Sequence, residues 1–300
     1  MAELLSWGRG RHGVLGSGDE TDAPTEEPIY VEGPLSARRI VQVCCGELHT
    51  VALTADAGAV FSWGSGLMGA LGHGGRSNEL LPRRVEAVSF ATSIAAAKHH
   101  STALCPESGG IVYTWGWDGW EGSGCVKTPT RLARLEGNAC QQVAAGAFHI
   151  AVLTTTAGVV TTGGGHFQSG VLAGVGIVRI AAGSRHTAAL TMDAAVHVWL
   201  HPSNGSSVGV APPPAPSRCP WLQGAQDIAC CGDHTAALLP TADGGRTARW
   251  QLSVQADGGA APGAGAPPAD VGGASVDGAD RLIGGGGYLL ALMADGGVVC

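Results

Sequence analysis

A segment of about fifty residues recurs along the chain and keeps three anchors in phase, which limits the fold more than any other feature of the sequence. A full copy carries Gly-x-x-His inside an apolar run, then Trp-Gly, and then a Pro-x-x-apolar segment before the next histidine, and several copies carry variants of these anchors. The histidine anchors are His49, His100, His149, His186 and His234, and the tryptophan anchors are Trp7, Trp63, Trp115 and Trp199. A period near fifty is typical of propeller blades rather than of the shorter helical-hairpin arrays.

Four short β-rich runs can be distinguished inside one copy. They cover residues 41–45, 50–54, 59–63 and 82–88, and Gly46 and the turn at residues 56–58 separate the first three. A lone four-stranded sheet exposes two faces and two edges, so stacking such sheets in a ring supplies burial and protects the edges. The sequence therefore predicts a single all-β propeller domain over residues 1–300, with about six blades.

The two ends of the chain carry complementary parts of one repeat. Residues 4–8 contain Trp-Gly without a preceding Gly-x-x-His, and residues 298–300 stop where the next Trp-Gly is due. We expect the N-terminal strand to pair with the C-terminal blade and to close the ring. A fragment of a longer propeller is the alternative, since terminal repeats are often atypical.

Three segments depart from the repeat. The copy at residues 162–199 is short and lacks the Pro-x-x-apolar segment, so we expect a blade with fewer strands. Residues 201–220 and 255–280 are rich in Ala, Gly, Pro and Ser. We interpret both as flexible insertions that project from the blades.

Composition and charge limit the classes of function that we expect for the chain. Glycine accounts for 49 of 300 residues and charged residues for only 14%, which suits tight turns between short strands. The net charge of -7 gives no reason to expect direct nucleic-acid binding. The sequence has no apolar run long enough for a membrane span, and its nine cysteines form no Cys-x-x-Cys pair. We therefore expect a protein of a reducing compartment, the cytoplasm or the nucleus.

Several motifs resemble catalytic or cofactor sites but are better explained by the repeat. Residues 8–13 and 64–69 satisfy the dinucleotide-binding pattern Gly-x-Gly-x-x-Gly, yet both follow the Trp-Gly strand instead of opening a helix. Histidines spaced one per repeat are expected to serve their own blades, each bonded to nearby backbone. We expect no catalytic residue, no metal and no cofactor.

Candidate partner-binding residues lie in two of the loops that follow Trp-Gly. In one loop exposed tryptophan stands beside acidic groups, a combination suited to a protein-binding hot spot. The residues of this loop are Trp117, Asp118, Trp120 and Glu121. A cap on the blade end is the alternative role for the two tryptophans. Arg9 and Arg11 make the equivalent loop of the first repeat basic, and a solvated turn is the alternative there.

The repeat resembles that of a known family. Trp-Gly-x-Gly-x-x-Gly-x-Leu-Gly at residues 7–16 and 63–72, with Gly-x-x-His-Thr at residues 46–50 and 183–187, is similar to the repeat of the regulator of chromosome condensation family. The resemblance implies a propeller, which in that family usually has about seven blades. A count of about six departs from that number.

Two functions from different classes follow. One is a non-catalytic protein-protein interaction scaffold that presents variable loops on rigid blades. The alternative, which the resemblance implies, is a guanine nucleotide exchange factor for a small Ran-like GTPase, an activity that needs no cofactor of its own. We expect a protein partner, such as a small GTPase or a chromatin-associated protein, and binding to neither nucleic acid nor membrane.

Overall fold

The computed structural model of the chain describes residues 4–21, 24–106, 110–117, 124–163, 166–201, 215–252, 272–284, 289–293 and 298–299. Within these ranges the regular elements are β-strands and short 3-10 turns, which confirms the all-β prediction. None of the described segments forms a helix long and apolar enough to cross a membrane. The chain divides into two compact units, Met1–Ala145 and Gly146–Cys300.

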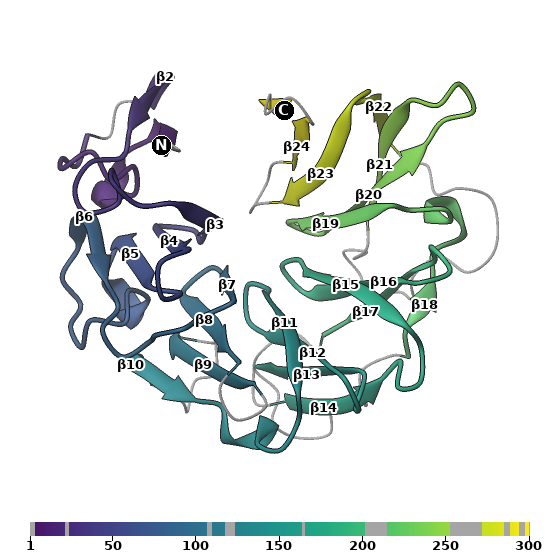
Figure 1. Cartoon of the computed structure of the whole chain (residues 1–300), viewed down its shortest axis with the longest axis horizontal. Coiled ribbons are helices and arrows are strands. Elements are labelled where there is room, and N and C mark those ends of the chain that lie inside the picture. Colours follow the sequence, from purple (N-terminus) through teal and green to yellow (C-terminus); the bar gives the residue numbers. More distant parts are fainter. Residues whose placement is uncertain are drawn as a thin grey trace. The chain divides into compact units, whose positions relative to one another are not determined.

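The first unit consists of antiparallel sheets in which strands consecutive in the chain pair with each other (Figure 1). Its strands are β1 (Leu5–Arg9), β2 (Pro24–Tyr30), β3 (Ile40–Cys45), β4 (His49–Thr54), β5 (Val60–Gly64), β6 (Glu79–Arg84), β7 (Ser93–Ala96), β8 (His100–Cys105), β9 (Ile111–Gly116), β10 (Val126–Arg131) and β11 (Cys140–Ala145). β1 and β2 form a two-stranded sheet, and β3 to β6 and β7 to β10 form four-stranded sheets. The 3-10 turns are η1 (Arg11–Gly13), η2 (Leu67–Gly69) and η4 (Ala133–Leu135).

Neighbouring sheets of the first unit pack face to face through apolar side chains. One core cluster joins the β3–β6 sheet to the β7–β10 sheet and includes Val51, Ile94 and Trp115. A second cluster includes Leu35 and Phe61 and packs against the other side of the β3–β6 sheet. Because both faces are covered, β4 and β8 are buried along their whole length. Each fully buried large apolar side chain contributes roughly 1.5 to 3 kcal/mol to this packing.

The second unit repeats the same antiparallel pattern. Its strands are β12 (Ile150–Thr154), β13 (Val159–Gly163), β14 (His166–Val171), β15 (Ile177–Ala182), β16 (His186–Thr191), β17 (Val196–Leu200), β18 (Ser217–Arg218), β19 (Asp227–Cys231), β20 (His234–Pro240), β21 (Arg246–Leu252), β22 (Gly272–Ser275), β23 (Ala279–Gly284), β24 (Leu289–Met293) and β25 (Val298–Val299), and its 3-10 turn is η5 (Pro220–Leu222). β15 to β18 and β19 to β22 form four-stranded sheets, and β23 to β25 form a three-stranded sheet. Apolar clusters fill the spaces between these three sheets.

The pairing predicted to close the ring is not among the strand pairings of the described residues. β1 pairs with β2, and β24 pairs with β25 through Leu292 to Val298 and Ala291 to Val299. The pairing of Leu292 with Val298 is equivalent to that of Leu53 with Val60, and Val60 belongs to β5, the third strand of the β3–β6 sheet. β25 therefore occupies, beside β24, the third-strand position that the prediction assigned to residues 4–8.

Two other expectations need correction. The short repeat does have a fourth strand, because β14 pairs with β13, and Gly163 and His166 face each other across a tight hairpin. The long loop found after Trp-Gly in other repeats is therefore absent there, while the strand is kept. Of the two predicted insertions, the part at 202–214 and the part at 255–271 lie outside the described residues. Their remaining ends form strands β18 and β22, so the predicted boundaries are too wide.

A β-bulge recurs at the start of the first strand of three sheets, and the sequence analysis did not detect it. The register shifts lie between Ile40 and Gln42, between Ile177 and Arg179, and between Ala279 and Arg281. A bulge inserts one residue into a strand and turns the side chains beside it. Valines 41 and 178, at two of the bulges, are accordingly more than half exposed.

The polar side chain seven residues before the histidine anchor ties neighbouring sheets together. Gln42 donates to the carbonyl of Ile94 over 2.7 Å and accepts from the N–H of Ile94 over 3.0 Å. In the second unit Asp227 accepts from the N–H of Leu282 over 2.8 Å and pairs with Arg179 over 2.6 Å. Burial raises the pKa of Asp227, and Arg179 opposes that rise. β3 and β19 thus each bind the backbone of the sheet that follows.

Two of the tryptophan anchors, Trp63 and Trp115, bind the loop of the preceding repeat. Trp63 Nε1 donates to the carbonyl of Val14 over 2.9 Å, and Trp115 Nε1 donates to the carbonyl of Ala70 over 2.8 Å. A Cβ on Gly72 would lie 2.9 Å from Trp115 Nε1, and one on the equivalent Gly16 would meet Trp63 at the same distance. The final glycine of the Trp-Gly loop is therefore required for the close approach of the next indole.

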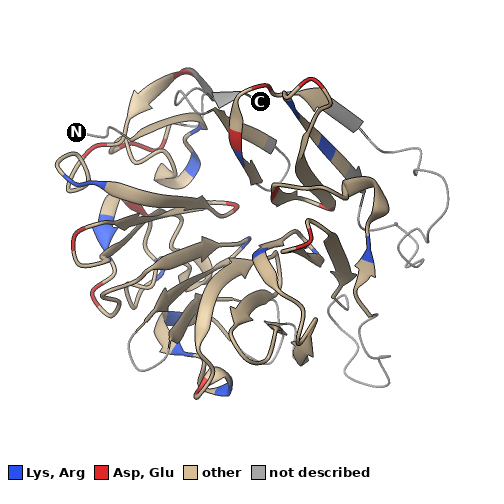
Figure 2. Ribbon diagram, turned by 45° about the vertical axis from the view of Figure 1, so that its right-hand side comes forward, with Lys and Arg blue, Asp and Glu red and all other residues tan. Residues whose placement is uncertain are grey.

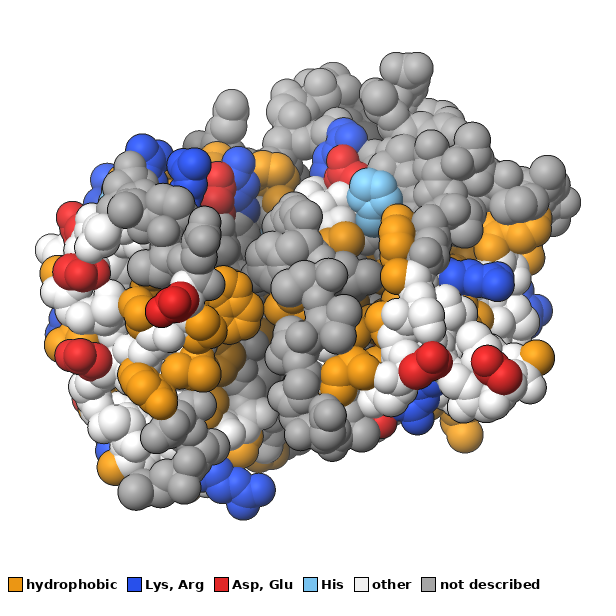
Figure 3. All heavy atoms as spheres, turned by 90° about the horizontal axis from the view of Figure 1, so that it is seen from above, with side chains coloured by type: hydrophobic (Ala, Val, Ile, Leu, Met, Phe, Trp, Pro, Cys, Tyr) orange, Lys and Arg blue, Asp and Glu red, His pale blue; other side chains and the backbone are white. Residues whose placement is uncertain are grey.

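Trp7 differs from the other tryptophan anchors in its burial. Trp63, Trp115 and Trp199 are at most 2% exposed, whereas Trp7 is 47% exposed. Within the first unit no earlier repeat supplies a loop against which Trp7 could pack. Leu5, paired with Tyr30, is also exposed. In Figure 3, which views the molecule from the side where β2 lies in Figure 1, hydrophobic side chains reach the surface among polar ones.

Replacing Gly72 with alanine should reduce the free energy of unfolding by about 2 kcal/mol or more, because the methyl group enters the space of the Trp115 indole at a left-handed backbone position. Gly74→Ala is the matched control. Gly74 also has a positive φ, but a Cβ there would meet only Thr128, at 3.8 Å. Urea denaturation of the two variants measures the difference, and an equal loss in both would contradict the role of the indole contact.

Candidate functional site

Three of the histidine anchors, His49, His149 and His186, join one repeat to the next through a buried hydroxyl. His49 Nε2 lies 2.8 Å from the hydroxyl oxygen of Ser101, which in turn donates to the carbonyl of Ala70 over 2.9 Å. Since Ser101 has a single hydroxyl hydrogen, His49 is the donor in its own bond. The Ala70 carbonyl also accepts from Trp115. A histidine, a serine and a tryptophan of two repeats therefore converge on one loop carbonyl.

The same contact recurs in the second unit. His149 Nε2 lies 2.9 Å from the hydroxyl oxygen of Thr187, and His186 Nε2 lies 3.0 Å from that of Thr235. The ring nitrogen thus contacts the hydroxyl of the next repeat, instead of the backbone of its own blade as the sequence analysis expected. The reason is the glycine three residues earlier. A Cβ on Gly183 would lie 2.2 Å from the His186 ring, so only glycine lets the imidazole lie flat over the turn.

These hydroxyls are residues that the sequence analysis did not single out. The sequence does contain a pattern that could have identified them, because serine or threonine directly follows the histidine in four of the five copies. The residues concerned are Thr50, Ser101, Thr187 and Thr235. Threonine is also common in strands for its shape alone, so the pattern by itself did not reveal a hydrogen bond.

Burial keeps His49 and His186 neutral. Desolvation, followed by neighbouring histidines, lowers the pKa of His49 to about 3 and that of His186 to about 3. Groups with such a pKa do not exchange protons near neutral pH. No cluster of metal-ligating side chains is found in the part of the chain that the structure describes. The chemistry of these histidines is structural.

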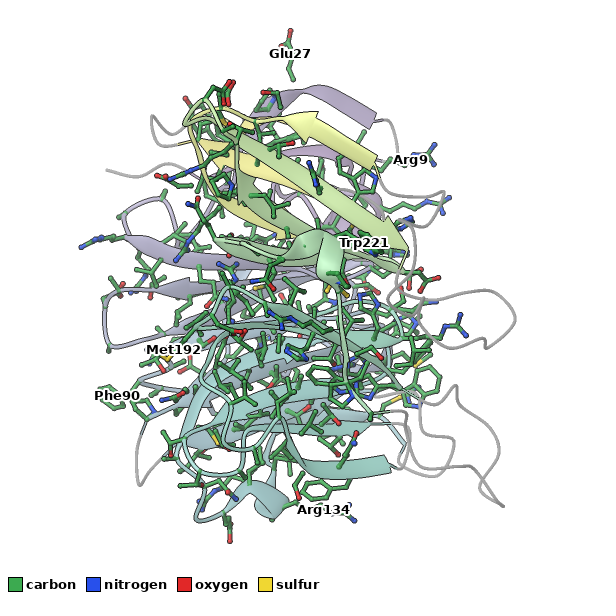
Figure 4. The ribbon with its side chains drawn as sticks, turned by 90° about the vertical axis from the view of Figure 1, so that its right-hand side faces the viewer. Arg9, Glu27, Phe90, Arg134, Met192 and Trp221 are labelled. Carbon is green, nitrogen blue, oxygen red and sulfur yellow. The ribbon has the colours of Figure 1, made fainter. Side chains whose placement is uncertain are left out.

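The loops that face solvent lie at the same end of the sheets as these histidines. His49 pairs with Gly64 and His100 pairs with Gly116. The turn before each histidine and the loop after each Trp-Gly therefore lie at the same end of the sheet. Arg9 and Arg11 are exposed at this end of the β1–β2 sheet, and Arg9 extends outward in Figure 4.

Trp117 lies in a small polar cluster at the same end. Its backbone N–H donates to the carbonyl of His99 over 2.9 Å, and the two rings lie 5.9 Å apart. Glu47 lies 3.7 Å from His99 Nε2 and 3.5 Å from Lys98 Nζ. Partial burial lowers the pKa of His99, and Glu47 opposes part of that effect. The turns of two repeats and the following loop thus meet around one half-buried tryptophan.

The predicted partner-binding residues are only partly brought together. Asp118, Trp120 and Glu121 lie outside the described residues. The contacts of the described residues join Trp117 to His99, while the loop of Arg11 is joined through His12 to Asn78. Acidic and basic side chains are interspersed over the described ribbon (Figure 2).

Comparison with known proteins identifies the repeat. The model of the regulator of chromosome condensation (RCC1) repeat matches residues 2–53 and 57–104, and a second model with the same description matches residues 40–70. His49, Ser101 and the Trp-Gly loop between them all fall within the matches. The chain carries RCC1 repeats.

Relatives of this RCC1-repeat protein include human HERC2, an E3 ubiquitin-protein ligase, which is 32% identical over 222 residues covering 66% of this chain and 4% of HERC2. The ultraviolet-B receptor UVR8 of Arabidopsis thaliana is 30% identical over 263 residues, which cover 79% of this chain and 58% of UVR8. The structure of yeast RCC1 (Prp20) bound to Kap60 matches with a TM-score of 0.70 at 21% identity, over 99% of this chain and 78% of that chain. This likeness shows that the RCC1-repeat chain has the propeller fold.

Acidification should destabilise the protein because of two anchor histidines, His49 and His186. Their folded pKa lies below the ordinary value of about 6.5, so the unfolded state binds protons first. The stability that they provide is complete above pH 6.5 and is lost as the pH falls toward about 3, by about 1.4 kcal/mol per pH unit for each histidine.

Urea titrations between pH 7 and pH 4 measure this slope. His49→Gln removes one titrating group, so the variant should be less stable at pH 7 and should show a shallower pH dependence. An unchanged slope in His49→Gln would contradict the assignment.

Proposed function

We propose that this chain is a non-catalytic protein-interaction scaffold, in which interlocked blades hold the loops at the histidine end for a protein partner. The observation that carries the proposal is the division of roles between buried and exposed groups. The groups that could perform acid-base chemistry, His49 and His186, are buried and neutral. At the histidine end Arg11 and Trp117 reach solvent from a turn and a loop, where binding residues are commonly found.

The loop of Trp117 is the part of this surface with the strongest local argument. A half-buried tryptophan packed beside His99 and Glu47 offers both an apolar face and charged neighbours. Such tryptophans are common among the residues that dominate binding energy. The proposal extends to Asp118, Trp120 and Glu121, which continue the same loop, and to Arg9 and Arg11 at the same sheet end.

The alternative function is nucleotide exchange on a small GTPase. It is supported by the likeness to yeast Prp20p, a structure of which was described together with its binding properties to Gsp1p and histones. That likeness is 17% in sequence and concerns the fold. We place the protein in a reducing compartment, the cytoplasm or the nucleus, and the eight described cysteines, all free, support this placement.

Affinity capture with the wild-type chain and with Trp117→Ala tests the loop. We expect the variant to lose partners that the wild type retains, because truncating a tryptophan at the centre of an interface typically costs 2 kcal/mol or more. Tyr30→Ala, which removes an exposed aromatic ring from another sheet, is the control and should retain them. An identical partner list for all three proteins would contradict the proposal.

A nucleotide-release assay separates the two functions. Gsp1p loaded with fluorescent GDP should release it at the same rate with and without this chain if the protein is a scaffold. Acceleration of release would overturn the non-catalytic proposal in favour of exchange.

A further inference from the structure

A basic pocket lies at the opposite end of the β3–β6 sheet from the histidine turns. It has a volume of about 670 Å³ and is lined by Pro34, Ala37, Arg38, Arg39, Ala55 and Asp56. These residues come from the connection that enters β3 and from the turn that follows β4. Its walls therefore combine small apolar side chains with two guanidinium groups and one carboxylate.

Arg38 is held in place by three contacts. Its Nε donates to the carbonyl of Pro34 over 3.1 Å, its terminal nitrogen pairs with Asp56, and its guanidinium lies 5.3 Å from the centre of the Phe61 ring. Such contacts fix the side chain and neutralise its charge locally. Arg38 thus forms a preorganised wall of the pocket.

Arg39 provides the unbalanced charge. It is exposed, and among the described residues it has no ion-pair partner. Its backbone carbonyl accepts from the N–H of Ala55 over 2.8 Å, so the base of the side chain is fixed. With Asp56 engaged by Arg38, the pocket has a net positive charge that suits an incoming carboxylate.

Phe90 provides an apolar contact beside the pocket. Its N–H donates to the carbonyl of Ala57 over 2.8 Å, which anchors it to the turn that carries Asp56. It has a φ of +57° and is 55% exposed, and in Figure 4 it projects at the edge of the molecule. A bulky residue in a left-handed conformation is strained, and such strain is found often at binding sites.

The repeat itself does not require these side chains. In the second unit Met192 donates its N–H to the carbonyl of Gly176 over 2.7 Å, the same contact that joins Ala55 to Arg39. The position of Arg39 is therefore occupied by glycine in another repeat with the backbone geometry unchanged. The arginine and its exposed charge are a property of this surface and not of the blade.

We propose that this pocket binds a segment of a partner protein in which an acidic side chain stands next to an apolar one. The carboxylate pairs with Arg39 against the wall formed by Arg38, and the apolar side chain packs on Phe90. The inference rests on the proposed scaffold function and adds a second binding surface to it, with the chemistry of its ligand.

Fluorescence anisotropy with two labelled peptides tests the proposal. In one peptide glutamate alternates with leucine, and in the other glutamine replaces glutamate. We expect the wild-type chain to bind the acidic peptide at least about tenfold more tightly than the neutral one, with an affinity that falls as salt is added. Equal affinity for the two peptides, or binding of neither, would overturn the proposal.

Variants locate the binding on the chain. Arg39→Glu should weaken binding of the acidic peptide by about tenfold or more, whereas Arg39→Lys should retain most of it. Phe90→Ser should weaken it as well. Arg131→Glu, at an exposed arginine of β10, is the matched control and should bind like the wild type. Loss of affinity in the control to the same extent as in Arg39→Glu would assign the effect to net charge and overturn the site.

The outcome is separable from that of the scaffold proposal. If peptide binding fails while Trp117→Ala still loses captured partners, only the pocket is disproved. If Trp117→Ala retains all partners while Arg39→Glu loses peptide binding, the pocket stands and the histidine-end loops are not the binding surface.

Discussion

The structure depends on one contact, the bond between a buried imidazole and the hydroxyl of the following repeat. In the contact of His49 it is reinforced, because the hydroxyl and the carbonyl that follows it each have a further partner. The His49 ring lies over a glycine, the Ser101 hydroxyl continues to the Ala70 carbonyl, and Trp115 reaches the same carbonyl. Buried polar groups that satisfy one another in this way are costly to disrupt, since removing one member takes a hydrogen bond from its buried partner.

This contact separates the parts of the repeat that are fixed from the parts that can vary. Glycine, histidine, the hydroxyl and tryptophan are held by their roles between sheets. The residues between them, such as Glu47 in the turn and Arg39 before β3, face solvent and have no such role. A propeller built on this contact can therefore present different chemistry at each end of its sheets without altering its core.

The repeat pattern was sufficient to predict the all-β architecture, the strands of the regular repeats and the RCC1 resemblance, because three anchors in phase leave few other folds. The role of the hydroxyls was not predictable, since threonine after histidine fits a strand without any bond. The bulge before Gln42 was not predictable either, because one extra residue in an apolar run leaves no compositional signal. Trp117 was recognised from its loop, whereas the pocket of Arg38 and Arg39 depends on a turn and a connection that meet only in three dimensions.

The histidine contact also has a direction, because each ring reaches forward along the chain to the next copy. The donor and acceptor in one pair are of the same kind as those in another, as His49 with Ser101 and His186 with Thr235 show. A copy that carries the hydroxyl can therefore follow any copy that carries the histidine without a new interface, whereas the copy with Ile150 at this position cannot form the bond. Internal gene duplication or deletion of a whole copy would therefore still place a histidine beside the hydroxyl of the copy that follows it, where that copy carries one. The number of repeats can then change by one copy at a time during evolution.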